Sequence, residues 1–342
     1  MKNIIFISTA AGPIKYFNII IKSLIKENYI FCITSSIGRP YIELPEKDIY
    51  IINEDEYNEN KTSYTSLLNH LVNSKLFDMA VVSAGWKSVL DKDLSIIFKQ
   101  KGILVVNIIE SWYVDRVFYN NKTLIADYLL VNDESAKQKC IDHGVIENKI
   151  HVLGNPVLET RWDNINSKNL NIKYKETTSF VDGKVILFIS EDYSRAFPKG
   201  SENYQGFDEY YVVQDILKEL NPNDKLYIKL HPMEDSTKYL YENILLVEQD
   251  ELDCFALNAD AVIGMGSILL LEIALKRNDV ISYRPNDNYS FFGNNIGATT
   301  LIKSKNDLSD FLNGKIILDK ENYENKFYGS TKRIVNFLME IA

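Results

Sequence analysis

The segment Asp260–Leu275 reads DAVIGMGSILLLEIAL and combines a strand, a turn and a helix. The apolar strand AVIG runs into a turn that contains Gly264 and Gly266. Ser267 is a residue type that favours the start of a helix, and the apolar run ILLLEIAL continues from it. A strand that passes through a short glycine turn into an apolar helix is typical of a parallel α/β sheet.

The same alternation of apolar strands and amphipathic helices continues from this segment toward both ends of the chain. We predict strands at Ile4–Ser8, Tyr29–Thr34, Ile49–Ile52, Met79–Ser83, Leu104–Ile108, Tyr128–Val131, Val185–Ser190, Leu226–Leu230, Ile244–Val247, Ala261–Ile263 and Val280–Tyr283. We predict helices at Ile14–Ile25, Ser63–Val72, Leu94–Gln100, Glu134–His143, Glu209–Leu220, Glu251–Leu257, Ile268–Leu275 and Thr331–Ile341. Because the strands are nearly continuous apolar runs, we expect parallel sheets with helices on both faces.

The alternation weakens between Trp162 and Thr178, where Asn, Lys and Ser dominate. A chain of 342 residues also suits two domains of about 150 residues each. We therefore predict a Rossmann-like domain at 1–155, a linker at 156–180, a second Rossmann-like domain at 181–330 and a C-terminal helix at 331–342. Ligands of such sheets bind at the carboxyl ends of the strands, so a cleft between the two domains is the expected place for a site.

The composition disfavours several kinds of protein. Lys and Arg total 38 against 47 Asp and Glu, a net charge of −9, which argues against a broad nucleic-acid-binding surface and leaves room for a local basic pocket. Cys32, Cys140 and Cys254 lack the spacing of a zinc site or a disulfide framework, which favours a reducing cytoplasm. No run of about 18 apolar residues predicts a membrane span. Lysines on or near the first helix fit either a solvated face or a peripheral membrane contact.

One strand of the second domain ends in a histidine and a proline, in the segment KLYIKLHPMED, Lys225–Asp235. Pro232 lacks an N–H group and biases His231 toward an extended backbone, so the imidazole points in a set direction at the edge of the sheet. Such a histidine can donate a hydrogen bond to a phosphate oxygen or protonate a leaving group near neutral pH. The alternative is a histidine that only caps or packs the strand. Lys229 and Arg284 can supply positive charge to an anionic ligand.

The glycine turn before the helix at Ile268–Leu275 has the composition of an anion site. Gly264 and Gly266 allow a ligand to approach the backbone closely, and the N–H groups that open the helix carry partial positive charge. Ser267 can cap this helix and also donate its hydroxyl. Glu272 is the one acidic residue of ILLLEIAL, and an unpaired buried carboxylate is costly, so we expect it to reach a hydroxyl or a cation. The alternative is a helix cap with a structural role alone.

Two further strand ends carry polar residues. The segment VILFISEDYS places Ser190 and Glu191 after the first strand of the second domain, where a loop cap is the alternative role. The segment VVNIIESWYVDRVF places Glu110 before Trp112 and Tyr113 in the first domain. A carboxylate beside two aromatic rings suits a sugar platform with a general base, although Trp112 fits a core position equally well.

The first strand leads into FISTAAGPIKYF, whose glycine spacing matches neither GxGxxG nor a P-loop. This spacing argues against a dinucleotide fingerprint, and we expect Gly12 to line an acceptor pocket. The pattern DxD occurs as DKD at 91–93, which we interpret as the start of a helix rather than as a metal site.

Three motifs together resemble a known family. They are LLVNDESAKQKCIDHGVIENKIHVLGNPVLE at 129–159, KLHP at 229–232 and IGMGSILLLEIALKRNDVISYRP at 263–285. Their combination resembles nucleotide-sugar glycosyltransferases of the GT-B architecture, an α/β fold of two Rossmann-like domains with parallel sheets that face an interdomain cleft. The similarity is greatest to the bacterial group with a His-Pro motif, which includes sialyltransferase-like and Kdo-transferase-like enzymes. The KI-V-GNP segment also occurs in UDP-sugar epimerases and hydrolases of this architecture.

The resemblance implies roles for the matching residues. His231 and Pro232 match the motif whose histidine contacts the donor phosphate and assists departure of the nucleotide. Ser267 stands where the family binds that phosphate, with Gly266 in place of the family's first hydroxyl residue, and Glu272 matches the acidic residue that bonds the donor ribose. We therefore assign donor binding to Ser190, Glu191, Lys229, Pro232, Gly264, Gly266, Ser267 and Glu272, acceptor binding to Gly12, Trp112 and Tyr113, and catalysis to His231 and Glu110.

The leading prediction from this resemblance is a transferase that moves a sugar from a nucleotide donor to a carbohydrate or glycoconjugate acceptor in bacterial surface polysaccharide synthesis. A CMP-activated sialic-acid-like or other ulosonic acid is the preferred donor because of the His-Pro pair, and UDP-sugars come second. We expect no metal, no other cofactor and no nucleic acid, and a cytoplasmic protein or one bound peripherally to the inner face of the membrane. The alternatives are a UDP-sugar 2-epimerase or hydrolase on the same scaffold, a polyol-phosphate transferase that uses CDP-glycerol, and a non-catalytic binding protein.

Overall fold

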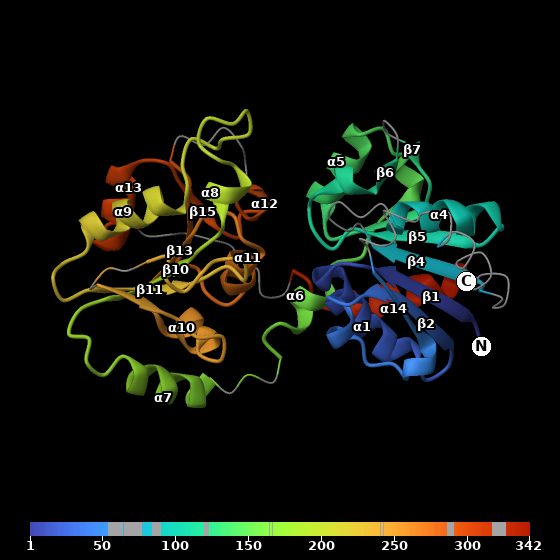
Figure 1. Cartoon of the computed structure of the whole chain (residues 1–342), viewed down its shortest axis with the longest axis horizontal. Coiled ribbons are helices and arrows are strands. Elements are labelled where there is room, and N and C mark those ends of the chain that lie inside the picture. Colours follow the sequence, from blue (N-terminus) through green and yellow to red (C-terminus); the bar gives the residue numbers. More distant parts are fainter. Residues whose placement is uncertain are drawn as a thin grey trace. The chain divides into compact units, whose positions relative to one another are not determined.

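The structure, a computed structural model, describes residues 1–53, 64, 77–83, 90–119, 123–163, 165, 167–239, 241, 243–285, 291–316 and 326–342. The chain divides into two compact units, which Figure 1 shows in ribbon form. Unit 1 consists of Met1–Arg161 and Lys326–Ala342, and unit 2 consists of Trp162–Asn325. The C-terminal segment therefore returns to the unit in which the chain begins.

Unit 1 is built on a seven-stranded sheet with the strand order β3-β2-β1-β4-β5-β8-β9. Every pairing described in this sheet is parallel, and β4 is buried at each of its positions. Burial on both faces explains why the strands are nearly continuous apolar runs. The strands are β1 (Asn3–Ser8), β2 (Tyr29–Ser35), β3 (Ile49–Ile52), β4 (Met79–Ser83), β5 (Leu104–Ile108), β8 (Tyr128–Val131) and β9 (Ile150–Val152), with a separate antiparallel pair β6 (Phe118–Tyr119) and β7 (Thr123–Leu124).

Helices pack on both faces of this sheet (Figure 1). Phe6 and Phe17 belong to the core on one face, together with Ile334 of the C-terminal helix. Ile7 and Phe98 belong to the core on the other face. The helices of unit 1 are α1 (Ala11–Leu24), α4 (Leu90–Gln100), α5 (Glu134–Asp142), α6 (Pro156–Thr160) and α14 (Ser330–Ile341), with short 3-10 turns at Arg39–Tyr41, Glu46–Asp48, Val114–Val117 and Glu147–Lys149.

The C-terminal helix α14 is held in unit 1 by a carboxylate at its N-terminus. Glu159, in α6, accepts hydrogen bonds from the N–H groups of Gly329 (2.6 Å) and Thr331 (2.8 Å) and from the hydroxyl of Thr331 (2.7 Å). The first turn of a helix leaves N–H groups without intrahelical partners, and a carboxylate both pairs with them and complements the helix dipole. Residues some 170 positions apart along the chain are joined in this way.

Unit 2 is built on a six-stranded sheet with the strand order β12-β11-β10-β13-β14-β15. All of its described pairings are parallel. The central strands β10 and β13 are buried at every position. The strands are β10 (Val185–Ile189), β11 (Lys225–Lys229), β12 (Ile244–Leu246), β13 (Ala261–Gly264), β14 (Val280–Tyr283) and β15 (Thr300–Ile302).

The helices of unit 2 also contribute to its core. Ile216 of α9 and Leu308 of α13 pack with Phe188 and Ile263 of the sheet in one apolar cluster. Phe255 of α10 packs its ring against Tyr227 of β11, with 4.4 Å between the ring centroids. The helices are α7 (Ser167–Thr177), α8 (Tyr193–Ala196), α9 (Glu209–Glu219), α10 (Leu252–Asn258), α11 (Ile268–Ala274), α12 (Phe292–Asn295) and α13 (Lys305–Leu312).

The predicted α/β fold with two Rossmann-like parallel sheets is confirmed. The DKD pattern at 91–93 lies in the first turn of α4, as predicted. The predicted linker at 156–180 instead contains α6 and α7, and the C-terminal helix joins unit 1. The predicted helix Ser63–Val72 lies outside the described residues, apart from position 64.

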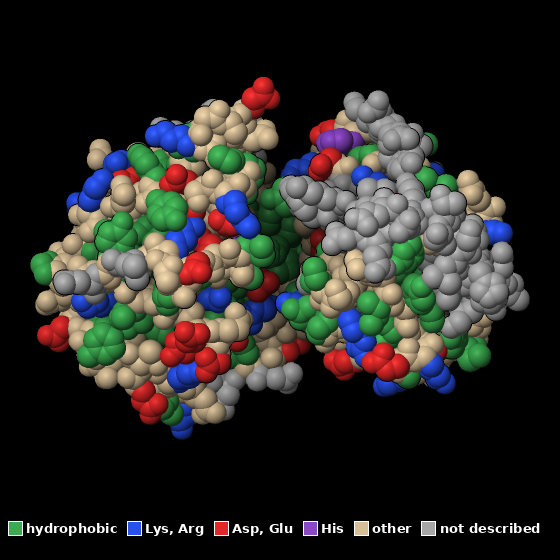
Figure 2. Space-filling view, in the orientation of Figure 1, with side chains coloured by type: hydrophobic (Ala, Val, Ile, Leu, Met, Phe, Trp, Pro, Cys, Tyr) green, Lys and Arg blue, Asp and Glu red, His purple; other side chains and the backbone are tan. Residues whose placement is uncertain are grey.

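The charges of unit 2 are mixed over the face that Figure 2 shows, with acidic and basic side chains interspersed. Within the part of the chain that the structure describes, none of the helices combines the length and the apolar character of a membrane span.

Candidate functional site

Four loops of unit 2 meet because the strands before them are neighbours in the sheet. The strands β11, β10, β13 and β14 lie side by side and run in the same direction, so their carboxyl ends form one edge. The loops at this edge begin at Leu230, Ser190, Met265 and Arg284. Since ligands of α/β sheets bind outside the carboxyl ends of the strands, we take this edge as the candidate site and call it the strand-end site.

His231 lies in a tight turn directly after β11. Its Nδ1 accepts a hydrogen bond from the N–H of Met233 (3.2 Å), and its own backbone N–H donates to Glu234 Oε2 (2.6 Å). Because Nδ1 is an acceptor, the neutral ring carries its proton on Nε2, which becomes the donor nitrogen. The set direction predicted for this imidazole therefore depends on two hydrogen bonds of the turn as well as on Pro232, which is exposed.

Glu191 connects the loop after β10 to the loop after β13. Its Oε2 accepts a hydrogen bond from the N–H of Gly266 (2.6 Å). Burial raises the pKa of Glu191 to about 7, although the Gly266 hydrogen bond and the charge of Arg284 act in the opposite direction. A carboxyl group with such a pKa suits a general acid or base, and a role of Glu191 in donor binding stays a prediction.

The raised pKa of Glu191 predicts a pH-dependent stability. The native state favours the protonated acid, so this contribution to the free energy of unfolding is fully present below the ordinary value of 4.5 and is lost as the pH rises through about 7. Glu191→Gln keeps a neutral side chain at every pH. In urea unfolding, the variant is expected to gain about 2 kcal/mol relative to the wild type between pH 5 and pH 8. An equal difference at both pH values contradicts the prediction.

The turn after β13 leaves no room for a side chain at Gly266. A Cβ atom there would lie 2.8 Å from Arg284 Nη1 and 3.0 Å from the hydroxyl of Tyr193. Arg284 is 4% exposed, and its guanidinium donates to the Tyr193 hydroxyl (3.1 Å) and to the carbonyl of Met265 (3.2 Å). Ser282 donates to the same carbonyl (2.5 Å). The glycine thus allows a permanent positive charge to lie against the turn.

Ser267 and Gly264 have structural contacts that are visible in the fold. Ser267 is the N-cap of α11, and its Oγ accepts a hydrogen bond from the N–H of Leu269 (3.2 Å). A Cβ atom at Gly264 would lie 3.0 Å from a methyl group of Leu270. These contacts match the structural alternative stated for the glycine turn, and phosphate binding by these residues stays a prediction.

Lys229 is the last residue of β11, and Glu272 belongs to α11. Lys229 Nζ donates to the carbonyl of Leu230 (3.0 Å), and burial lowers the pKa of Lys229. Glu272 is partly buried in α11, and its backbone carbonyl accepts a hydrogen bond from the indole N–H of Trp162 (2.7 Å). This contact ties the first residue of unit 2 to α11. Binding of a donor ribose by Glu272 remains untested.

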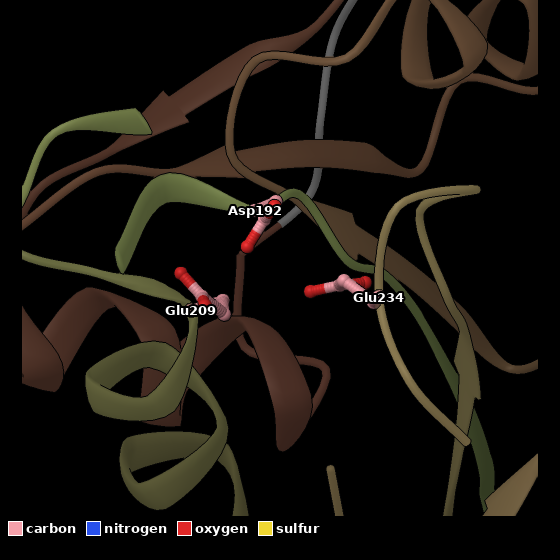
Figure 3. A group of neighbouring side chains, drawn as sticks. All are labelled: Asp192, Glu209 and Glu234. Carbon is pink, nitrogen blue, oxygen red and sulfur yellow. The ribbon is translucent and has the colours of Figure 1, made fainter. Parts of the chain in front are cut away.

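Three carboxylates converge on one lysine beside the strand-end site. Asp192, Glu209 and Glu234 come from the loop after β10, the start of α9 and the loop after β11, and they point toward one another (Figure 3). Lys238 Nζ donates to Glu234 Oε1 (2.6 Å) and to Glu209 Oε1, and lies 4.0 Å from Asp192 Oδ1. The spacing of the carboxylates would suit a metal ion, but the ammonium group already supplies positive charge among them. We call these four residues the Lys238 cluster.

Ser190 contacts the Lys238 cluster. Its side chain is buried at 3% exposure, and its hydroxyl donates to Glu234 Oε1 (2.8 Å). Ser190 Oγ also lies 3.0 Å from the hydroxyl oxygen of Tyr239. Since a serine has one proton to donate, Tyr239 is the donor in the second hydrogen bond. The hydroxyl predicted to bind a donor substrate is therefore committed to protein groups in this structure.

In unit 1, Glu110 follows β5 and is fixed through its backbone. Its carbonyl accepts hydrogen bonds from the side-chain amides of Asn132 (3.0 Å) and Asn155 (2.9 Å). Burial, and to a smaller extent the charge of Glu110, raises the pKa of Tyr16. Glu110 therefore lies at the carboxyl edge of the first sheet, where the sequence pattern predicted it, and its role as a base stays a prediction.

Trp112 lies in the core of unit 1. It is 2% exposed, its indole N–H donates to Asp133 Oδ2 (3.0 Å), and its ring packs edge-on against Phe327 with 6.5 Å between centroids. The ring has no open face for a sugar in this structure, so the core alternative describes Trp112 and the predicted platform needs correction. Tyr113 is 46% exposed and Gly12 is exposed in the first turn of α1, so both remain accessible.

Sequence reasoning did not identify Glu234, Lys238 and Tyr239 as site residues. They lie in the segment HPMEDSTKY, within eight positions of His231. Their spacing follows neither the period of a strand nor that of a helix, because the segment is an irregular loop between β11 and β12. The one available signal was an acid and a lysine close to a strand-end histidine, a pattern that is also common in exposed loops.

Comparison with protein-family models and with curated proteins finds no match. Solved structures do match over nearly the whole chain. The UDP-GlcNAc 2-epimerase of Methanocaldococcus jannaschii is 18% identical, with a TM-score of 0.68 over 99% of this chain and 100% of that one. The UDP-GlcNAc 2-epimerase of Neisseria meningitidis, solved with UDP-GlcNAc, is 13% identical, with a TM-score of 0.65 over 99% and 100% of the two chains. The Anabaena HepE protein, solved with UDP-glucose, is 10% identical, with a TM-score of 0.64 over 100% and 98%.

These likenesses establish the GT-B-like fold and correct the functional prediction. Two of these three structural neighbours are UDP-GlcNAc 2-epimerases, and the third was solved with UDP-glucose. The prediction of a glycosyltransferase that uses a CMP-activated acidic sugar is therefore wrong. The alternative that the sequence left open, a UDP-sugar 2-epimerase or hydrolase on the same scaffold, accords with the architecture that the chain shares over its full length.

Proposed function

We propose that the chain binds a UDP-sugar at the strand-end site and acts on it as a 2-epimerase or a hydrolase. The observation that carries the proposal is the meeting of three groups at one sheet edge: the imidazole of His231, the acid Glu191 with its pKa of about 7, and the buried cation Arg284. The whole-chain likeness to UDP-GlcNAc 2-epimerases supports the choice of nucleotide and of reaction.

Departure of the nucleotide is the step that the strand-end site suits. When the bond between C1 of the sugar and the diphosphate oxygen breaks, negative charge develops on the phosphate. Nε2–H of His231 is a directed donor for that oxygen, and the fixed charge of Arg284 stabilises the anion at longer range. Both reactions, epimerisation and hydrolysis, share this requirement.

The two reactions differ in what happens at the sugar ring. In an epimerase the C2 proton is removed as the bond from C1 to the diphosphate oxygen breaks, which leaves a C1=C2 double bond and free UDP. A proton is then returned to the opposite face of C2 while the UDP oxygen re-forms its bond to C1, so an epimerase needs a proton acceptor. A hydrolase instead lets water attack C1 and releases UDP and the free sugar.

A donor-only incubation tests the proposal. The full-length protein is mixed with UDP-GlcNAc in D₂O without any acceptor, and proton and phosphorus NMR spectra are recorded over time. An epimerase gives the C2 epimer with deuterium at C2, and a hydrolase gives UDP and the free sugar. A parallel incubation with a CMP-activated sugar is expected to show no turnover.

Binding provides an independent readout. UDP and UDP-GlcNAc are expected to raise the melting temperature in a concentration-dependent way, because they bind the native state alone, whereas CMP is expected to have little effect. Unchanged UDP-sugars together with an unchanged melting temperature at millimolar UDP would overturn the proposal.

A further inference from the structure

The carboxylate of Glu234 organises the turn that carries His231. Its Oε2 accepts the backbone N–H of His231 (2.6 Å), and its Oε1 accepts the hydroxyl of Ser190 (2.8 Å) and the ammonium of Lys238 (2.6 Å). The side chain of Glu234 has no exposed surface. The two oxygens of Glu234 thus accept from three donors that belong to three different residues.

A buried carboxylate of this kind needs a partner of opposite charge. Lys238 supplies it, with a side chain that is 7% exposed. Burial alone disfavours the charged lysine, but the hydrogen bonds to Glu209 and Glu234 outweigh burial and raise the pKa of Lys238. Removing one partner of a buried ion pair leaves the other charge uncompensated, so the loss of Lys238 would leave the carboxylate of Glu234 buried without its counter-ion.

Lys238 is itself held from several sides. Glu209 has no exposed side-chain surface and also accepts hydrogen bonds from the N–H (2.8 Å) and the hydroxyl (2.5 Å) of Ser194, in α8. The ammonium group lies 4.7 Å from the ring centroid of Tyr210 and 5.7 Å from that of Tyr239, within range of a cation–π interaction. The lysine is thus a fixed point that joins α8, α9 and the loop after β11.

We propose that Lys238 is a positioning residue that acts through Glu234 to fix the His231 turn and the direction of the imidazole. The inference rests on the proposed function for its catalytic consequence, but the geometry of the turn does not depend on which substrate binds. In this role Lys238 keeps Nδ1 of His231 as an acceptor and Nε2 as a donor. An ion pair on the surface would have no such effect.

Unit 2 contains a matched control for the loss of a lysine. Lys305 Nζ lies 2.8 Å from Asp215 Oδ1, an acid on α9 with 3% exposure, and 5.1 Å from the ring centroid of Tyr211. This pair also joins a lysine to a buried α9 acid beside a tyrosine ring, but the side chain of Lys305 is 52% exposed, whereas that of Lys238 is 7% exposed. Among its recorded contacts, none involves His231 or Glu234. Lys305→Met therefore removes a lysine beside a buried α9 acid without disturbing the turn, and Asp215 keeps Lys218 at 3.5 Å.

The test compares Lys238→Met, Lys238→Arg and Lys305→Met in the full chain labelled with ¹⁵N-histidine. The protein has four histidines, so the His231 signals are assigned by their absence in His231→Ala. In the wild type and in Lys305→Met, His231 is expected to show an unprotonated Nδ1 and a protonated Nε2. In Lys238→Met the ring is expected to move toward a mixture of both tautomers, and Lys238→Arg is expected to recover the original signals in part.

Turnover of UDP-GlcNAc is measured with the same proteins. Lys238→Met is expected to lower kcat about tenfold or more, with a smaller change in KM, because a misdirected donor loses orientation rather than binding. If Lys238→Met does not fold, Glu234→Gln, which keeps the size and one acceptor, carries the same test. His231 signals in the folded variant that are identical to those of Lys305→Met would overturn the inference. Because the spectra need no substrate, a failure of the proposed function would leave this result readable.

Discussion

Replacing His231 with alanine is expected to lower the rate of UDP-sugar turnover by about 10²–10⁴-fold, the range typical of a lost general acid or charge-stabilising donor. The imidazole of His231 can donate through Nε2, because its Nδ1 accepts a hydrogen bond from the N–H of Met233 (3.2 Å). The loss of this single neutral hydrogen bond at a partly exposed position is expected to change the free energy of unfolding by less than about 1 kcal/mol. Kinetics and urea unfolding of the same preparations measure both quantities.

A second substitution separates two roles of the imidazole. In His231→Gln the side-chain amide offers an N–H donor near the position of Nε2 but cannot transfer a proton at neutral pH. If hydrogen-bond donation to the departing phosphate is the role, this variant keeps most of the activity that alanine loses. If proton transfer is required, the two variants are equally slow. His143→Ala is the control, since this exposed histidine stacks on Phe118 in unit 1 and is expected to retain the wild-type rate. Full activity of His231→Ala contradicts the assignment.

The strands were predictable where burial is uniform. The segments MAVVS in β4 and VISY in β14 are buried at every position, and their predicted bounds match the observed ones. Uniform burial removes the alternation of polar and apolar residues and leaves a short apolar run between breaks. The edge strands β9 (IHV) and β15 (TLI) span three residues each and include a polar residue, so no apolar run marked them, whereas the equally short edge strand β12 lies in the apolar run ILLV and was predicted.

The candidate site was predictable only as far as topology fixes it. Adjacent parallel strands bring their carboxyl ends together, so the order of strands suffices to place His231, Glu191 and Ser267 at one edge. The contacts between these loops could not be predicted from the order of the strands. Glu191 bonds the N–H of Gly266 across 75 positions of sequence, and Lys238 meets acids from three elements. Such pairings depend on the conformation of irregular loops, for which local patterns carry little information.

The return of the last helix to unit 1 shows the same limit. The segment Thr331–Ile341 is amphipathic, and its helix was predictable from periodicity, but no local pattern states which sheet its apolar face covers. The packing of α14 against the sheet of unit 1 depends on groups that are far away in sequence. Glu159 caps the helix, and the backbone N–H of Asn155 donates to Ser330 Oγ (3.0 Å) at its start.

Gly154→Ala is expected to destabilise unit 1 by about 3 kcal/mol, because it combines two costs. Gly154 has a φ of +94°, a conformation that residues with a Cβ atom rarely adopt. A Cβ atom there would also lie 2.0 Å from Ser330 Oγ and 2.9 Å from Ser330 Cβ. Rotating the hydroxyl cannot relieve the second contact, and Ser330 is fully buried, so the start of α14 must move.

Gly144→Ala separates the two costs. Gly144 has a φ of +88°, but a Cβ atom there would meet nothing within 4 Å, so this variant retains the backbone cost of about 1 kcal/mol and lacks the clash. Hydrogen exchange read by peptide measures where the stability is lost. In Gly154→Ala, exchange is expected to accelerate in α14 and in α1, which pack in one core, and to stay unchanged in β10 of unit 2. Equal effects of the two substitutions would mean that contact with Ser330 does not hold α14, and the capping by Glu159 would then have to hold the helix by itself.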